Sequence, residues 1–207
     1  MQLLIDPTKI TNFTRTTAEL QAFFLFGLFC AGKNSDYAAK CLAKLLNTIE
    51  GETPFEVLKN LGEIGIYNAL CASRIGQYNR LTRAVMGAVD LDLATCSLED
   101  LMNVHGVGQK TARFFLLHTR PDCQCAVLDT HILKWLRDNQ ESDAFKNGVP
   151  QSTPTNVKQY LALEKQFLFL ARLNFPFMSI ADIDLTLWMK YSGRLEDDKS
   201  VPKLFAE

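Results

Sequence analysis

HGVGQK, residues 105–110, is the stretch of the sequence that decides the fold. Apolar residues at helical spacing precede it over 98–104 and follow it over 109–118. Its two glycines permit backbone conformations with φ > 0, and Val107 between them can fill the apolar gap between two helices. The sequence therefore predicts a helix, a tight hairpin and a second helix within residues 98–118.

Helical signals dominate the rest of the chain as well. No alternating strand pattern is found, so the expected fold class is all-α. Caps or first-turn prolines mark several helix starts, at Thr53-Pro54, at Thr153-Pro154 and at Ser97 with Asp100. Further helices are expected over 17–31, 35–46, 54–58 and 157–173.

Composition limits the class of protein. The 207 residues are 47% hydrophobic, enough for a sizeable core. The most apolar run, 22–31, is about half of the roughly 20 residues that cross a bilayer, so a buried core helix is predicted and no membrane partner. The first residues do not resemble a secretion signal, which favours an intracellular location, cytoplasmic if the source is prokaryotic.

The six cysteines show no paired framework, and reduced thiols are expected. Cys123 and Cys125 are two residues apart, but no cysteine follows them, and His131 has a better role in supporting a helix start. We therefore expect no metal site.

The net charge of −1 gives no broad attraction to nucleic acid, so any DNA binding must be organised locally. The hairpin glycines let a phosphate approach the N–H groups that begin the second helix. Lys110 then has two interpretations: it neutralises a phosphate, or it is a reactive amine held against DNA. The hairpin alone does not decide between them.

Asp129, in the stretch VLDTH (127–131), supplies the second clue, nineteen residues after Lys110. It precedes an amphipathic pattern and is placed to cap the helix that begins near Thr130. It can also present a carboxylate toward Lys110 across a groove. One side chain can do both.

The pairing of VHGVGQKTA (104–112) with VLDTH (127–131) resembles the helix-hairpin-helix/Gly-Pro-Asp superfamily of DNA glycosylases. Pro121 matches the proline of the intervening loop, whereas the glycine expected there is absent. The resemblance implies that Asp129 is the essential acid. It also implies that Lys110 is the amine of the bifunctional members, which remove a base and then cleave the strand.

The C-terminal part narrows the resemblance. Members similar to endonuclease III carry four C-terminal cysteines for an iron–sulfur cluster, but this chain has none after Cys125, so that cofactor is not expected. Asp184 and Trp188, one helical turn apart, resemble the base-pocket pair of archaeal-type 8-oxoguanine DNA glycosylases, with Gln21 as a third candidate. The alternatives are a core tryptophan on an amphipathic helix and a surface glutamine.

The family also implies an architecture of two helical lobes with a DNA-binding groove between them. One lobe is expected over 16–126; the other comprises 1–15 and 127–207, with a base-pocket helix near 181–191. A structural monovalent cation at the hairpin and a monomeric state are further expectations. The expected DNA contacts are His105, Gly106, Val107, Gly108, Lys33 and Asn34.

The expected activity is excision of 8-oxoguanine from double-stranded DNA through a lysine Schiff base, followed by strand cleavage by β-elimination (AP lyase activity). Two alternatives remain open. One is a bifunctional glycosylase of the same fold for another damaged or modified base. The other is a non-catalytic helix-hairpin-helix DNA-binding protein.

Overall fold

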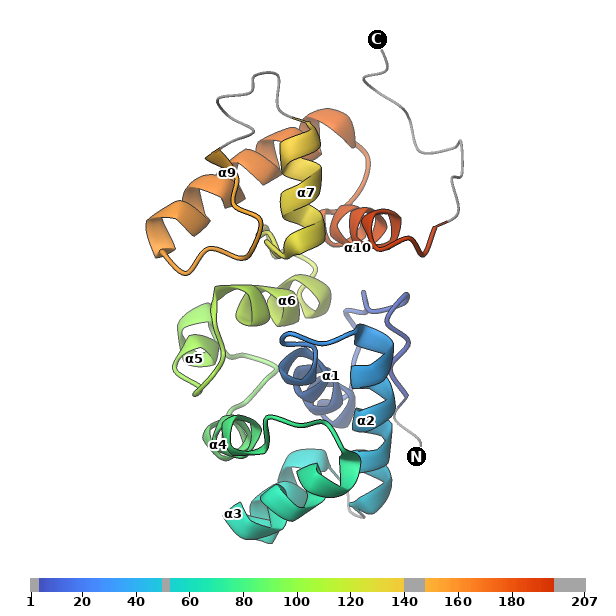
Figure 1. The fold of residues 1–207 in the computed structure, drawn as a ribbon, viewed down its shortest axis with the longest axis vertical. Coiled ribbons are helices and arrows are strands. Elements are labelled where there is room, and N and C mark those ends of the chain that lie inside the picture. Colours follow the sequence, from blue (N-terminus) through green and yellow to red (C-terminus); the bar gives the residue numbers. More distant parts are fainter. Residues whose placement is uncertain (1–3, 50–52, 140–147, 196–207) are drawn as a thin grey trace. The chain divides into compact units, whose positions relative to one another are not determined.

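The computed structural model describes residues 4–49, 53–139 and 148–195, and every regular element in these ranges is a helix (Figure 1). The predicted all-α class is confirmed for this part of the chain. The chain divides into two compact units, and the boundary falls between Pro121 and Asp122.

The first unit is built around one buried helix. Its described helices are α1 (Thr17–Phe29), α2 (Ser35–Thr48), α3 (Pro54–Ser73), α4 (Tyr78–Ala88), α5 (Leu98–Met102) and α6 (Gln109–Thr119). Helices α2, α3, α4 and α6 all pack against α1. The predicted core helix over 17–31 is therefore present, although it ends two residues earlier than expected.

Helix α1 is buried along its whole length from Leu20 onward, so it has no solvent face to make it amphipathic. Its aromatic side chains meet those of α6: the Phe23 ring lies 5.1 Å from Phe114, and the Phe24 ring packs edge-on against Phe115. Burying one such side chain contributes about 1.5–3 kcal/mol. The aromatic contact between these two helices therefore fixes the position of α6 and of the hairpin that precedes it.

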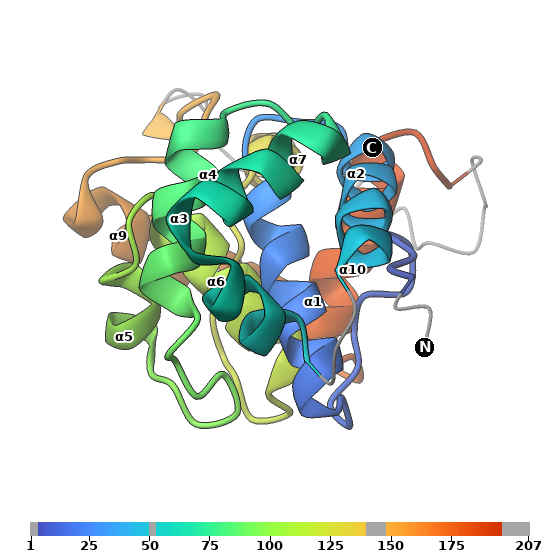
Figure 2. The same ribbon diagram turned by 90° about the horizontal axis from the view of Figure 1, so that it is seen from below.

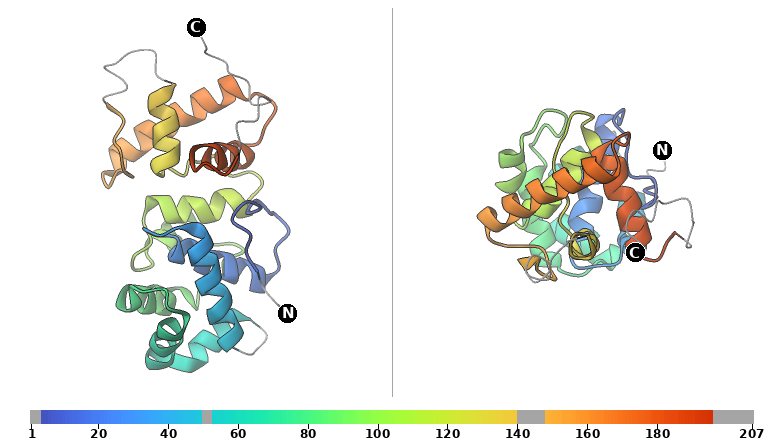
Figure 3. Two further views of the ribbon diagram at one scale, coloured as in Figure 1. Left: turned by 45° about the vertical axis from the view of Figure 1, so that its right-hand side comes forward. Right: turned by 90° about the horizontal axis from the view of Figure 1, so that it is seen from above.

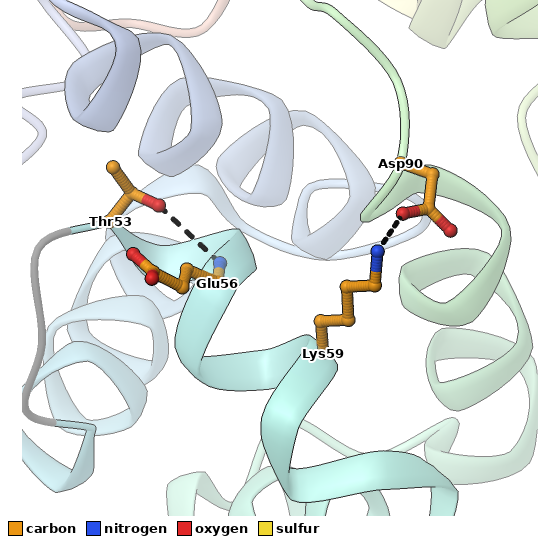
Figure 4. A network of polar contacts seen from close by, with 4 residues as sticks. All are labelled: Thr53, Glu56, Lys59 and Asp90. Atoms are coloured by element: carbon orange, nitrogen blue, oxygen red, sulfur yellow. Dashed lines mark hydrogen bonds and ion pairs between the residues drawn. The ribbon is translucent and has the colours of Figure 1, made fainter.

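Predicted caps begin two of the helices. The Thr53 hydroxyl accepts the N–H of Glu56 at 3.4 Å, and Pro54 occupies the first helical position (Figure 4). Ser97 and Asp100 form the reciprocal capping box, in which the Ser97 N–H donates to the Asp100 carboxylate at 2.8 Å. Both predictions are confirmed.

Helix α3 is much longer than the predicted segment 54–58. Gly62, with φ +63°, interrupts it and splits it into two helical stretches. Helices α3 and α4 lie side by side (Figure 2). The exposed Lys59–Asp90 ion pair, 2.5 Å, links α3 to the residues after α4 (Figure 4). Surface pairs of this kind stabilise a fold little.

For the described residues 4–15, the structure differs from the expected division into units. Asn12 N–H donates to the carbonyl oxygen of His118 at 3.2 Å, and the Thr11 hydroxyl lies 3.0 Å from the His118 Nδ1. The Arg15 guanidinium donates to the same carbonyl and lies over the Phe23 ring at 4.1 Å. These bonds tie the segment to α6, so it belongs with the first unit, and the boundary comes earlier than the expected residue 126.

The second unit contains α7 (Thr130–Asp138), α9 (Val157–Asn174) and α10 (Ile180–Tyr191) (Figure 3). Helix α7 packs on α10, and the Trp135 ring meets the Phe167 ring of α9 edge-on. Helix α9 is capped by Asn156, so the predicted Thr153-Pro154 start is wrong. The Thr153 hydroxyl instead donates to the carbonyl oxygen of Leu128 at 2.7 Å.

Candidate functional site

The hairpin between α5 and α6 is held by its own backbone. The Val107 N–H donates to the Val104 carbonyl at 3.0 Å. Gly106 has φ +77°, a conformation that favours glycine over any residue with a Cβ. Val107 is buried, as a residue that fills the gap between two helices should be, whereas His105 and Gly108 are exposed.

The start of α6 is open to an anion. Gly108 is the N-cap residue and supplies no side-chain hydrogen bond to the first turn. The first N–H groups of a helix have no partner within the helix, and they carry its positive end. A Cβ added at Gly108 would meet nothing within 4 Å, so the space beside this N-cap residue is open.

Lys110 is half-buried in the first turn of α6 and lies near the end of α1. Burial raises the pKa of the Cys30 thiol to about 12, and the positive charge of Lys110 opposes that rise. Cys30 is therefore an uncharged neighbour of the amine. Cys30 is the C-cap residue of α1, so Lys110 lies near the C-terminal end of the core helix.

Arg80 of α4 joins the hairpin to the core helix. Its guanidinium donates to the carbonyl oxygens of Leu28 at 3.0 Å and Gly106 at 3.4 Å, and its Nε donates to Gln77 at 2.6 Å. Partial burial lowers the pKa of Arg80. These hydrogen bonds join Gly106 of the hairpin to Leu28 near the end of α1, so Arg80 positions the hairpin.

The turn between α1 and α2 carries two of the expected DNA contacts. The Asn34 side-chain oxygen caps α2 by accepting the N–H groups of Asp36 and Tyr37. The Lys33 N–H donates to the Cys30 carbonyl at 3.2 Å, and its amine lies 3.5 Å from the position a Cβ would take on Gly76. Lys33, the hairpin and Lys110 therefore all adjoin the C-terminal end of α1.

Gln21 is a buried residue of the first unit. Only 8% of its surface is exposed, and its carboxamide oxygen accepts the N–H of Phe55 at 2.9 Å in the first turn of α3. This bond gives Gln21 a structural role in joining α1 to α3. The expected base contact by Gln21 stays a prediction.

Asp129 caps α7. Its Oδ1 atom accepts the N–H groups of His131 and Ile132, each at 2.9 Å. Both bonds fall on one oxygen, so the cap engages one of the two oxygens of a half-buried carboxylate. The capping role predicted for Asp129 is confirmed. The second carboxylate oxygen, Oδ2, takes no part in this cap.

The two base-pocket candidates lie on α10 of the same unit. Asp184 is 5% exposed and Trp188 is half-buried. The His131 ring meets the Trp188 ring edge-on at 6.5 Å, and the Arg194 guanidinium lies over it at 4.8 Å. The cap of α7 is therefore linked to Trp188 through His131.

The predicted site residues thus fall into two groups. The hairpin, Lys33 and Lys110 are brought together in the first unit, and Asp129, Asp184 and Trp188 belong to the second. Sequence reasoning missed the hairpin clamp of Arg80 and the guanidinium of Arg194, because neither contact leaves a local sequence pattern.

The described ranges also bear on the expected metal and membrane features. No cluster of three or more His, Cys, Asp or Glu side chains there could hold a metal ion. In the same ranges, no helix has both the length and the hydropathy needed to cross a bilayer. The monovalent cation expected at the hairpin stays a prediction.

Comparison with known proteins found no matching family model, curated protein or solved structure.

Proposed function

We propose that the chain is a DNA glycosylase with AP lyase activity that removes 8-oxoguanine and then cleaves the strand. One observation carries the proposal: a half-buried amine, Lys110, stands in the first turn of a helix whose N-terminus is open and preceded by a glycine hairpin. The resemblance of 104–112 and 127–131 to bifunctional glycosylases supports the same activity.

The hairpin supports binding of a DNA backbone. Its uncapped N–H groups and the positive end of α6 can hold a phosphate without any base-specific contact. This local arrangement suits a chain with a net charge of −1, which has no general affinity for nucleic acid. The Lys33 amine, 3.5 Å from the position a Cβ would take on Gly76, adds a positive charge in the same unit.

Asp129 supports the chemical step. A carboxylate near the sugar stabilises the positive charge that develops as the base departs, and it can accept a proton from the amine. The proposal requires the Lys110 amine and the Asp129 carboxylate to meet at one extruded nucleotide. The DNA would then lie in a groove between the two units, as the resemblance implies.

The reaction divides into two bond-breaking steps. The neutral Lys110 amine forms a bond to C1′ while the glycosidic bond breaks, and the base leaves with the electron pair and takes up a proton. Opening of the sugar ring gives an imine between Lys110 and C1′. Loss of a proton from C2′ then expels the 3′ phosphate, and water releases the enzyme from the imine.

The choice of base rests on the C-terminal pair. Stacking of an extruded base on an aromatic ring contributes roughly 1–3 kcal/mol, and Trp188 offers such a ring. The Asp184 carboxylate can accept hydrogen bonds from the N–H groups of an oxidised guanine. Asp184 and Trp188 are one turn apart on α10, which places them on one face of the helix.

Borohydride trapping tests the proposal. The chain is incubated with a duplex containing 8-oxoguanine, and the imine is reduced to a stable covalent adduct. We expect an adduct with the wild-type protein and none with Lys110→Gln. The matched control is Lys59→Gln, an exposed lysine of the same unit that should trap like the wild type.

A panel of lesions separates the two catalytic alternatives. Trapping with a different damaged base, but not with 8-oxoguanine, would keep the nucleophile and change the substrate. Equal binding to damaged and undamaged duplexes, without any adduct, would favour the non-catalytic DNA-binding protein and refute the enzyme proposal.

A further inference from the structure

Two thiols at the beginning of the second unit lie close to each other. The Sγ atoms of Cys123 and Cys125 are 3.2 Å apart, and both side chains are half-buried. A disulfide bond is about 2.04 Å long, so the sulfurs need to approach by little more than an ångström. Among the other cysteines, Cys41 and Cys96 are buried.

The backbone around this pair is anchored. The Gln124 carboxamide oxygen accepts a hydrogen bond from Arg172 at 3.0 Å. The Ala126 N–H donates to the Glu164 carboxylate at 2.9 Å, and the Tyr160 hydroxyl donates to the Ala126 carbonyl at 2.7 Å. Helix α9 therefore holds the segment in place. The two thiols stay close to each other, so no large conformational change is needed before they react.

The anchoring limits how far this segment can adjust when a bond between the thiols forms. Residues 123–125 belong to no helix or turn. A disulfide needs Cα atoms about 4.4–6.8 Å apart, whereas two steps of fully extended chain span about 6.6–7.2 Å, so a bond strains the segment more the more extended it is. Strained disulfides are reduced more easily than relaxed ones. The geometry therefore favours a bond that forms and breaks over one that holds the fold together.

We propose that Cys123 and Cys125 are a site of reversible oxidation by hydrogen peroxide, which joins them in an intramolecular disulfide. One thiolate attacks a peroxide oxygen, the O–O bond breaks, and a sulfenic acid and hydroxide form. The second thiol attacks that sulfur and expels water, which creates the S–S bond. In sum, the thiols give up two electrons and two protons, and the peroxide becomes two molecules of water.

This inference is independent of the proposed DNA chemistry, because it uses neither Lys110 nor Asp129. The reverse reaction needs a dithiol reductant, whose two thiols become its own disulfide as Cys123 and Cys125 are restored. The pair is thus a modification site whose state reports the surrounding redox conditions.

Peptide mapping of the whole folded protein tests the inference. The protein is treated with a limited amount of peroxide, its remaining thiols are alkylated, and the digest is analysed by mass spectrometry. We expect the peptide that holds residues 123–125 to lose two hydrogen masses and to escape alkylation. The bridged form should make up most of the oxidised 123–125 peptide, because the neighbouring thiol 3.2 Å away captures the sulfenic acid before a second peroxide molecule does. Dithiothreitol should reverse the change.

Serine variants identify the partners. In Cys123→Ser or Cys125→Ser the bridge cannot form, and the remaining cysteine should yield a sulfenic acid that dimedone captures. The control Cys71→Ser should oxidise like the wild type. If peroxide converts the wild-type pair to separate sulfenic or sulfinic acids and no bridged peptide forms, the inference is overturned. That outcome is read from the unmodified chain, so it does not depend on the variants folding.

Discussion

The Arg80 guanidinium donates a hydrogen bond to the carbonyl oxygen of Gly106 at 3.4 Å while it also holds the Leu28 carbonyl at 3.0 Å. One side chain of α4 therefore connects the hairpin to the end of the core helix. This contact adds to the backbone hydrogen bond of Val107 and to the packing of α6 in holding the hairpin.

Replacing Arg80 by alanine should destabilise the first unit and loosen the hairpin. Hydrogen bonds from a charged donor contribute about 1.5–3 kcal/mol, and partial exposure of Arg80 places the expected loss of unfolding free energy at the lower end. Urea unfolding measures the loss, and hydrogen exchange at residues 104–108 should quicken. Arg83→Ala, an exposed change on the same helix, is the control. Equal stability of the two variants would contradict the clamp.

The two hairpin glycines should respond differently to alanine. Gly106→Ala places a Cβ at φ +77° and 3.3 Å from the Arg80 side chain, so a loss of roughly 1–2 kcal/mol in unfolding free energy is expected. Gly108 has φ −106° and open space around it, so Gly108→Ala should leave the thermal midpoint nearly unchanged. Under the proposed function it should nevertheless weaken DNA binding, because the Cβ stands where a phosphate approaches.

Electrophoretic mobility shifts with a lesion duplex provide the second measurement for this glycine pair. A Gly108→Ala protein that keeps both its stability and its DNA affinity would remove the open helix start from the proposed interface. A Gly106→Ala protein as stable as the wild type would show that the loop relaxes freely.

Most of the helices predicted from the sequence begin at a side-chain cap, and the exception, α6, was marked by the glycine hairpin before it. Thr53 and Ser97 both mark helix starts by their hydroxyls. Helix α4 was missed because its N-cap, Gln77, takes a left-handed conformation and provides no side-chain hydrogen bond. Helix α3 was predicted too short because Gly62 interrupts its pattern.

The candidate site was predictable only where its residues form local patterns. Lys110 and Asp129 stand at helix starts, which the sequence marks, and the cap by Asp129 is present. Arg80 acts through carbonyl oxygens at positions 28 and 106, and no pattern within α4 encodes such distant partners. The surface position considered for Gln21 is wrong, because the residue is buried and its oxygen joins two helices.

Acid should destabilise the fold partly through Glu19. Its backbone and side-chain hydrogen bonds from Thr16 lower its pKa below the ordinary value of 4.5. The charged form is therefore favoured in the folded state, so its contribution is complete above pH 4.5 and is lost as the pH falls through the lowered pKa. Glu19→Gln should show a smaller loss of stability with acid than the wild type.

Thermal melts between pH 7 and pH 3 measure this dependence. The comparison variant is Thr16→Val, which removes the hydroxyl but keeps the carboxylate, and it should reduce the acid dependence only in part because the Thr16 N–H still donates. Parallel curves for the wild type and Glu19→Gln would exclude Glu19 as a source of the acid effect.

Asp129 allows the structural and chemical roles of one side chain to be separated. Asp129→Ala removes the cap of α7 and should cost about 0.5–2 kcal/mol of unfolding free energy. Asp129→Asn keeps an oxygen that can accept the N–H groups of His131 and Ile132, and asparagine caps helices about as well as aspartate. Its stability should therefore stay close to that of the wild type.

Under the proposed function, both Asp129 variants should nevertheless lose base excision, because neither has a carboxylate to stabilise the developing charge or to take a proton from the amine. Stability comes from chemical denaturation, and activity from single-turnover release of 8-oxoguanine. The decisive protein is Asp129→Asn: full stability with little excision assigns the carboxylate a chemical role beyond the cap. Full stability with full excision would leave Asp129 as a helix cap alone, and the acid would have to be sought elsewhere in the chain.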